Sequence, residues 1–206
     1  MIKNLLFDLG GVIVDIRRQN CIDAFTAIGM GRIAELLDDY AQRGPAQEIE
    51  EGKITPSEFC DEMRKFTGVD ADDTTIRNAF AAFIIGTPVR RLHALKELQR
   101  DYNILYLSNT NPIMWEQAIG PSLTQEGHPI DYYFNGGGVR SYEAGVMKPN
   151  PEIFHILERQ TGIKPEETLF FDDSAANCNI AASLGYHTVH VAPGTEFYNY
   201  EIPTLP

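Results

Sequence analysis

Polar residues suited to phosphoryl chemistry occur in four separate stretches of this sequence. Three of them directly follow a short apolar run, and one stands in a loop before a proline. In chain order the stretches are Phe7-Asp8-Leu9-Gly10-Gly11, Leu107-Ser108-Asn109, Met147-Lys148-Pro149 and Phe171-Asp172-Asp173. A residue that follows a strand in an open α/β sheet lies at the edge where such folds bind their ligands. We therefore expect the four stretches to meet at one site.

Each stretch is a weak signal when it is taken alone. An Asp after a strand is usually a helix cap or a turn residue, and a lone Lys148 is most often a solvated surface charge. The adjacent carboxylates of Asp172 and Asp173 are different, because they repel each other at a buried strand end unless a cation lies beside them. The combination favours one metal-assisted site over four unrelated loops.

Five short apolar runs predict the strands that position these residues. Their continuous rather than alternating apolar character is typical of a parallel sheet covered on both faces. The predicted strands are Leu5–Leu9, Ile104–Ser108, Tyr132–Phe134, Thr168–Asp172 and His187–Val191. Helical patterns at 89–100, 149–162 and 177–185 separate the later strands. Strands that alternate with helices indicate an α/β fold with a doubly wound parallel sheet.

Residues 16–86 interrupt this rhythm, because they contain helical patterns and no convincing strand. The predicted helices are Cys21–Ile28, Arg32–Ala41, Pro56–Phe66 and Thr74–Phe83. We therefore predict an α/β core of residues 1–15 and 87–206 and a small all-helical domain of residues 16–86, inserted after the first strand. Substrate specificity would come from this insert. Arg17, Arg18 and Lys53 are its candidate contacts with a phosphate or hydroxyl group, and solvated charges are the alternative interpretation.

Composition limits the classes of partner. The formal net charge of -12 argues against nucleic acid and against anionic membranes as partners. An acidic protein that binds an anion needs local positive charge, which a divalent cation supplies. The three cysteines lack C-x-x-C spacing, and no apolar run reaches the length of a signal peptide or a membrane span. We therefore predict a cytoplasmic monomer or homodimer that acts on a small phosphorylated molecule.

The four stretches together resemble the motifs of the haloacid dehalogenase (HAD) superfamily, and the resemblance covers the whole chain. Asp8, Ser108, Lys148-Pro149 and Asp172-Asp173 correspond to motifs one to four in that order. The helical insert is similar to the first-position cap of the superfamily. Residues 7–15 are similar to a bacterial branch that includes a glucose-1-phosphate phosphatase. The resemblance implies a Rossmann-like core, Mg²⁺ as cofactor and a phosphatase that works through an aspartyl-phosphate.

The resemblance also implies a role for each residue. Asp8 would be the nucleophile, and Ser108 and Lys148 would contact the phosphoryl oxygens. Asp172 would be the fourth catalytic residue and would orient metal-bound water. The implied metal ligands are Asp8, the main-chain carbonyl of Gly10 and Asp173. The implied substrate-binding residues are Gly11, Ser108, Asn109, Lys148 and Arg17.

One position departs from the family pattern. Most phosphatases of this family carry a second Asp two residues after the nucleophile as general acid and base, and this chain has Gly10 there. General acid catalysis typically contributes about 10²- to 10⁴-fold to the rate. Three explanations remain open: a substrate with a good leaving group, such as the anomeric oxygen of a sugar 1-phosphate; a proton donated by Asp15 or by the insert; or a protein that binds phosphorylated ligands and turns them over poorly.

Two alternatives to a phosphatase remain. A 2-haloacid dehalogenase of the same superfamily also attacks through an Asp and lacks the second Asp, but it needs no metal. The Asp172-Asp173 pair argues against it for that reason. The other alternative is a weakly catalytic phosphometabolite-binding protein. Metal-dependent turnover of p-nitrophenyl phosphate would separate these classes.

Overall fold

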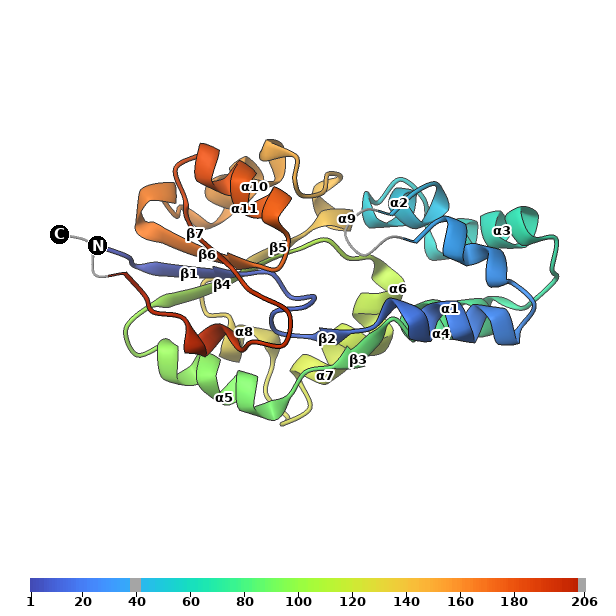
Figure 1. The fold of residues 1–206 in the computed structure, drawn as a ribbon, viewed down its shortest axis with the longest axis horizontal. Helices are drawn as coiled ribbons and strands as arrows, with labels where there is room; N and C mark the ends of the chain where they lie inside the picture. The colour runs from blue at the N-terminus through green and yellow to red at the C-terminus, as the bar shows by residue number, and fades with distance from the viewer. Residues whose placement is uncertain (38–41, 204–206) are drawn as a thin grey trace.

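The computed structural model describes residues 1–37 and 42–203, and its centre is a five-stranded parallel sheet (Figure 1). The strands follow the order β5-β4-β1-β6-β7. Their bounds are β1 Asn4–Phe7, β4 Asn103–Ser108, β5 Gly138–Arg140, β6 Thr168–Asp172 and β7 His187–His190. β1 lies in the middle, where Asn4 pairs with Asn103 of β4 and with Thr168 of β6. The predicted α/β fold with a parallel sheet is confirmed.

Helices cover both faces of the sheet because alternate strand residues point to opposite sides. Leu6 and Phe170 pack with the helices α10 (Pro151–Thr161) and α11 (Ala175–Ser183). Phe7 and Phe171 stack with ring centroids 4.8 Å apart on the other side, where α5 (Val89–Leu98) and α8 (Ile130–Tyr133) lie. The chain's last described turn, Phe197–Asn199, covers the same side, with Phe197 5.0 Å from Phe7.

The predicted strand at Tyr132–Phe134 was wrong. Tyr133 closes the short helix α8, Phe134 follows it, and the edge strand β5 begins four residues later. Both aromatic residues are buried, and Phe134 packs edge-on against Tyr106 of β4 at 5.2 Å. β5 was missed because it begins with Gly138, where any Cβ would collide with the Tyr106 ring. A strand of three residues with one buried apolar side chain has no readable apolar run.

The insert is helical, as predicted. Its elements are α1 (Arg18–Ala27), a 3₁₀ turn (Gly31–Glu35), α2 (Pro45–Glu50), α3 (Pro56–Thr67) and α4 (Asp73–Ala81). Its core contains Phe59 and Phe80, whose rings stack at 4.5 Å. The predicted helix Arg32–Ala41 is corrected to the 3₁₀ turn, and its residues 38–41 lie outside the described residues. α2 was not predicted. This helix has only six residues and begins with a proline, so it is too short to show a helical pattern of apolar residues.

A two-stranded ribbon joins the insert to the core. β2 (Asp15–Ile16) pairs antiparallel with β3 (Ile84–Gly86), which corrects the prediction that this region holds no strand. Strands of two and three residues are too short to show periodicity. The Arg91 guanidinium of α5 fixes the ribbon, because it donates to the Asp15 carboxylate at 2.7 Å and to the Ile13 carbonyl at 3.1 Å. Both chain crossings between insert and core therefore run side by side (Figure 1).

Several short elements complete the chain. They are α6 (Pro112–Met114), a π-helical turn (Trp115–Ile119), α7 (Gly120–Leu123), α9 (Ser141–Ala144) and a 3₁₀ turn (Pro165–Glu167). The segment α6 to α7 follows β4 and contacts α4 and β3, and α9 contacts α2. The core therefore touches the insert on two sides. Within the described residues, no helix has both the length and the apolar character needed to cross a bilayer.

Candidate active site

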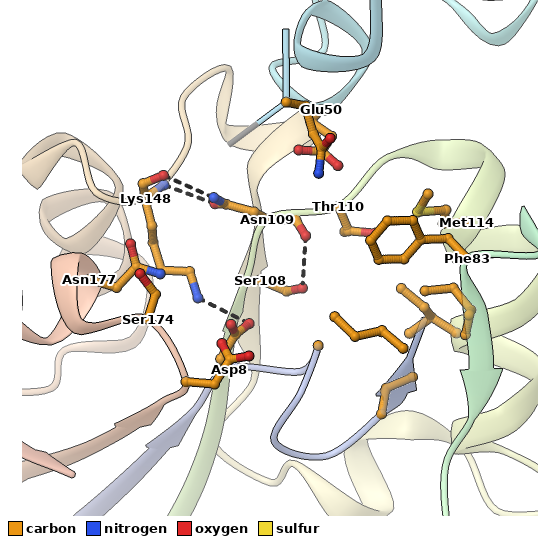
Figure 2. A pocket seen from close by; sticks show the side chains of 17 residues that line it. Asp8, Glu50, Phe83, Ser108, Asn109, Thr110, Met114, Lys148, Ser174 and Asn177 are labelled. Atoms are coloured by element: carbon orange, nitrogen blue, oxygen red, sulfur yellow. Dashed lines mark hydrogen bonds and ion pairs between the residues drawn. The ribbon is translucent and has the colours of Figure 1, made fainter. Parts of the chain in front are cut away.

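A cavity lies where the carboxyl ends of β1, β4 and β6 face the insert (Figure 2). Its floor comes from the core and contains Asp8, Gly10, Ser108, Asn109, Lys148 and Asp173. Its other walls contain Val14, Ile16, Gln42, Glu50, Phe83, Ile84, Thr110, Met114, Ile119, Ser174 and Asn177. The structure thus brings six of the nine sequence-predicted site residues together around one space. Of the other three, Asp172 and Gly11 lie next to cavity residues, and Arg17 lies elsewhere.

Lys148 is buried between two carboxylates at the floor. Its Nζ lies 3.0 Å from Asp8 Oδ1 and 2.7 Å from Asp172 Oδ2. Only 3% of the residue is exposed, which rules out a solvated surface charge. Burial by itself favours the neutral amine, but the two carboxylates outweigh it and raise the pKa of Lys148. The ammonium therefore stays charged beside the candidate nucleophile.

Asn109 holds the lysine in place. Its side-chain Nδ2 donates to the Lys148 carbonyl at 2.9 Å, and its Oδ1 accepts from the Lys148 main-chain N–H at 2.8 Å. Both ends of the amide are therefore engaged by the loop that carries Lys148 (Figure 2). The neighbouring Ser108 hydroxyl is less committed, because its one hydrogen bond, to the Asn109 carbonyl, is long at 3.4 Å. Ser108 can turn this hydroxyl toward a bound oxygen.

Asp172 is fully enclosed, and its charge is balanced by donors from three directions. Besides Lys148, it accepts from the Ser174 main-chain N–H at 2.8 Å and from Asn177 Nδ2 at 3.0 and 3.1 Å. These donors replace the hydrogen bonds with water that a buried carboxyl group loses. The arrangement fits a residue that positions Lys148 rather than one that reacts.

Three carboxylates come close enough to share a cation. One oxygen from each of Asp8, Asp172 and Asp173 lies within 4.8 Å of the other two. Burial raises the pKa of Asp8 to about 8; Lys148 opposes this shift, and Asp172 and Asp173 add to it. Burial and the Asp172 charge raise the pKa of Asp173 as well. Clustered oxygen donors whose ionisation is unfavourable without a cation suit a hard ion, so these residues fit Mg²⁺.

Gly11 makes room for this cluster. Its φ is +75°, and a Cβ at this position would overlap the Asp173 carboxylate. The Gly11 N–H donates to the Val14 carbonyl at 2.9 Å, so this amide is already used within the loop. The residue predicted to bind substrate therefore shapes the site by its missing side chain.

The cationic candidates of the insert lie away from the cavity. Arg17 is exposed at the start of α1, and Arg18 donates to the Ala34 and Leu37 carbonyls at the surface of the insert. Lys53 pairs with Glu51. Among the described residues that line the cavity, Lys148 is the one basic side chain.

Glu50 is the cavity residue that sequence reasoning missed. It ends α2, and it is buried with 8% of its surface exposed. Burial, with a smaller contribution from the Glu51 charge, raises the pKa of Glu50 to about 8. In the sequence it stands in the acidic stretch Glu48-Ile49-Glu50-Glu51, which is typical of a solvated helix face. The chain sequence gave no signal for its burial, because that depends on how the insert packs over the core.

Comparison with known proteins identifies the family. A sequence model of the haloacid dehalogenase-like hydrolases matches residues 2–185. A D-ribitol-5-phosphate phosphatase of Bacteroides thetaiotaomicron is 36% identical over 197 residues, which cover 96% of this chain and 95% of that protein. The chain therefore belongs to the haloacid dehalogenase-like hydrolase family.

Two solved structures show the same fold at similar identity. A HAD family enzyme from Bacteroides thetaiotaomicron, in complex with magnesium and inorganic phosphate, is 37% identical and superposes with a TM-score of 0.87 over 97% of this chain and 98% of its own. A HAD-like hydrolase from Porphyromonas gingivalis is 34% identical, with a TM-score of 0.88 over 97% and 95% of the two chains.

Proposed function

We propose that this member of the haloacid dehalogenase-like hydrolase family is a Mg²⁺-dependent phosphatase that acts on a small phosphorylated metabolite through an aspartyl-phosphate at Asp8. The observation that carries the proposal is the buried Lys148, which lies between Asp8 and Asp172 beside a third carboxylate, Asp173. The magnesium and phosphate bound by the similar HAD enzyme support the same assignment.

Each floor residue has a task in this proposal. Asp8 attacks phosphorus, and Lys148 balances the charge of the phosphoryl oxygens while Asp172 and Asn109 hold it there. Ser108 donates its hydroxyl to a phosphoryl oxygen. Asp8, Asp173 and the Gly10 carbonyl hold Mg²⁺, which supplies positive charge that lowers the repulsion between a carboxylate and a phosphate.

The substrate class that we propose is a polyhydroxylated small molecule with a terminal phosphate. The D-ribitol-5-phosphate phosphatase, 36% identical over nearly the whole chain, supports a sugar-alcohol phosphate as its first example. A sugar 1-phosphate, which the sequence suggested because of Gly10, is the second candidate. The two differ in leaving group: the first releases a primary alcohol and the second an anomeric hydroxyl.

We also propose that residues 16–86 act as a cap domain over residues 1–15 and 87–206. The chain passes from one to the other through the two strands of the β2–β3 ribbon. The cavity lies between the insert and the strand ends. Rotation about this ribbon would admit substrate and then exclude water. The cytoplasmic location and the choice between monomer and homodimer stay predictions from the sequence.

The test is phosphate release from a panel of sugar-alcohol phosphates and sugar phosphates, with Mg²⁺ and with EDTA. We expect phosphate release in the presence of Mg²⁺ and none in EDTA, with the largest kcat/KM for a sugar-alcohol phosphate. The Asp8→Asn variant should release no phosphate from any substrate. Chloride release from 2-chloropropionate in EDTA would instead establish the dehalogenase. Binding of the panel without turnover would establish a phosphometabolite-binding protein.

A further inference from the structure

The floor of the cavity has no side chain free to protonate a leaving group. Three of the described titratable residues that line the cavity belong to the floor. Asp8 is the proposed nucleophile, Lys148 is held in two ion pairs, and Asp173 belongs to the carboxylate cluster. Gly10, where the family pattern has its second Asp, offers no side chain. A proton donor must therefore come from elsewhere.

Asp15 does not fill this gap. Its carboxylate pairs with Arg91 of α5 at 2.7 Å, and its side chain is 41% exposed. It is absent from the cavity lining and lies instead in a shallow surface depression with Gly86 and Thr87. A carboxyl group that is held by a guanidinium away from the cavity is not placed to protonate a leaving group inside it.

Glu50 has the placement that Asp15 lacks. It is the one described titratable residue that lines the cavity from the insert, and in Figure 2 it lies at the top of the view with Asp8 at the bottom. A group that attacks phosphorus and a group that protonates the departing oxygen must approach from opposite sides. Glu50 comes from the insert and Asp8 from the strand ends, so the two line the same cavity from different sides.

The surroundings of Glu50 favour a carboxylic acid over a carboxylate. The cavity is lined by the apolar Phe83, Met114 and Ile119 and by the polar Gln42, Asn109 and Thr110, and Lys148 of the floor is the one basic side chain among its described lining residues. Burial raises the pKa of Glu50 to about 8. A neutral acid can sit opposite an incoming phosphate, whereas a second anion there would repel it. Burial therefore favours the protonated form of Glu50, which is the form that can donate a proton.

We propose that Glu50 is the general acid and base of the reaction and replaces the Asp that is absent at Gly10. This inference rests on the proposed phosphatase function. As the Asp8 Oδ–P bond forms, the bond from phosphorus to the leaving oxygen breaks. The leaving oxygen keeps the electron pair of that bond and accepts the proton of Glu50. The alcohol departs, and Glu50 is left as a carboxylate. In the second half, Glu50 removes a proton from the water that attacks phosphorus, which releases inorganic phosphate and restores both Asp8 and protonated Glu50.

The proposal explains how a chain with Gly10 could act on a sugar-alcohol phosphate. A primary alkoxide is a poor leaving group, so its departure needs a proton in the transition state. A donor on the insert reaches the leaving oxygen only when the insert covers the strand ends. Proton donation would then be available to the bound substrate and withheld while the cavity is open to water.

The test compares two substrates that differ in leaving group and carry no sugar hydroxyls, phenyl phosphate and p-nitrophenyl phosphate. Phenolate leaves less readily than p-nitrophenolate, so phenyl phosphate depends more on a proton donor. In Glu50→Gln we expect kcat/KM for phenyl phosphate to fall about a hundredfold more than kcat/KM for p-nitrophenyl phosphate. The matched control is Glu51→Gln, which removes the adjacent carboxylate that pairs with Lys53 outside the cavity.

A second measurement addresses the base. Because Glu50→Gln still forms the aspartyl-phosphate from p-nitrophenyl phosphate but hydrolyses it slowly, a burst of p-nitrophenolate equal to the enzyme concentration should precede the steady state. Partial misfolding of the variant would lower both substrates equally and leave their ratio unchanged.

Three outcomes would overturn the proposal. One is an equal loss for both aryl phosphates. Another is a loss confined to KM for polyol phosphates, which would make Glu50 a contact for substrate hydroxyls. The third is the same selectivity change in Glu51→Gln. If wild-type protein turns over neither aryl phosphate with Mg²⁺, the proposed function itself fails, and that result is distinct from a failure of the Glu50 assignment.

Discussion

The floor of the cavity and its roof, which is the part that the insert contributes, both bury acidic side chains, but the floor gives them a basic partner and the roof does not. On the floor, Lys148 lies within 3.0 Å of Asp8 and Asp172, so charge is held by partners. On the roof, Glu50 ends a short helix of the insert, where no basic side chain of the described residues lines the cavity. Burial raises the pKa of both Glu50 and Asp8 to about 8, but only Asp8 has Lys148 beside it to oppose the shift. Burial alone thus does not fix the state of a carboxyl group. The partner set decides it, and the two sides of one cavity become suited to attack and to proton donation.

The largest expected effect tests the floor. Asp8→Asn removes the nucleophile and should lower kcat for p-nitrophenyl phosphate by at least about ten-thousandfold, since no other floor carboxylate is free to attack. Steady-state assays with saturating Mg²⁺ measure this. Asp101→Asn, at an exposed turn before β4, is the control and should retain full activity. Near-normal turnover in Asp8→Asn would remove the chemical role assigned to the floor.

A second prediction measures how strongly the floor holds its charges. Lys148→Met leaves Asp172 without its ammonium partner in a fully buried place, and this should cost about 3–5 kcal/mol of unfolding free energy in EDTA. Urea denaturation gives the value. Lys53→Met removes an exposed ammonium from its pair with Glu51 and should cost much less, because solvent screens such a charge. Equal losses in the two variants would mean that burial of Lys148 contributes nothing.

A third prediction concerns the roof, where replacing the buried acid should raise the unfolding free energy at high pH, whereas replacing Lys148 on the floor should lower it. The pKa of Glu50 is about 8 in the folded chain against an ordinary value of 4.5, so the folded state binds its proton more tightly. Stability from this group is therefore greatest below pH 4.5 and falls as the pH rises toward 8. A glutamine at position 50 does not titrate, so the stability of Glu50→Gln should not fall with pH for this reason. It should unfold like wild type at low pH and be more stable above pH 8, by on the order of a few kcal/mol.

Urea titrations from pH 4 to 9 in EDTA measure that difference. Glu51→Gln serves as the comparison, because hydrogen bonds from Lys53 and Gln47 outweigh the effect of burial and lower the pKa of Glu51. Its difference from wild type should not grow in favour of the variant as the pH rises. A flat difference for Glu50→Gln as well would show that the roof does not disfavour charge.

A fourth prediction moves the proton donor from roof to floor. Gly10 has no positive φ, and a Cβ there would meet only the Ile16 side chain at an ordinary 3.5 Å. Adding Gly10→Asp to Glu50→Gln should therefore raise kcat/KM for phenyl phosphate about ten- to hundredfold above that of Glu50→Gln alone. Gly10→Asn in the same background has the same size and no acid, so it should restore nothing. Equal recovery by both would point to packing instead.

The smallest effect concerns the glycine beside it. Gly11→Ala and Gly162→Ala each place a side chain on left-handed backbone, at φ +75° and +72°, and should each cost about 1–2 kcal/mol of stability. Only the Cβ at Gly11 meets another group, the Asp173 carboxylate. Mg²⁺ titration by calorimetry should therefore show weaker binding in Gly11→Ala and unchanged binding in Gly162→Ala.

The floor could be predicted from the sequence because its signals are local. Asp8 directly follows β1, and Ser108 and Asp172 end β4 and β6. Each of these strands has its own apolar run, and parallel strands end at one edge of a sheet. The same reasoning failed where the local pattern was short. β5 begins at Gly138 and buries a single valine, while the aromatic run at Tyr132–Phe134 looked like a strand and is the end of a helix.

The roof could not be predicted because its properties are not local. Glu50 and Lys53 stand three residues apart in one charged stretch, yet Glu50 is buried over the cavity and Lys53 is exposed. Nothing in their neighbouring residues separates them. Their difference comes from the packing of α2 against α9 and α3, which brings together segments far apart in the chain.

The sequence alone determined the family, the parallel sheet and the identity of the charged residues at its edge, because strand patterns and short motifs act through neighbours in the chain. The tertiary structure alone decided which of those residues are buried, that Asn109 holds Lys148, that Gly11 yields its space to Asp173, and that an acid of the insert faces Asp8. Burial and electrostatic coupling depend on distances in space, and those are set only when the insert packs over the core.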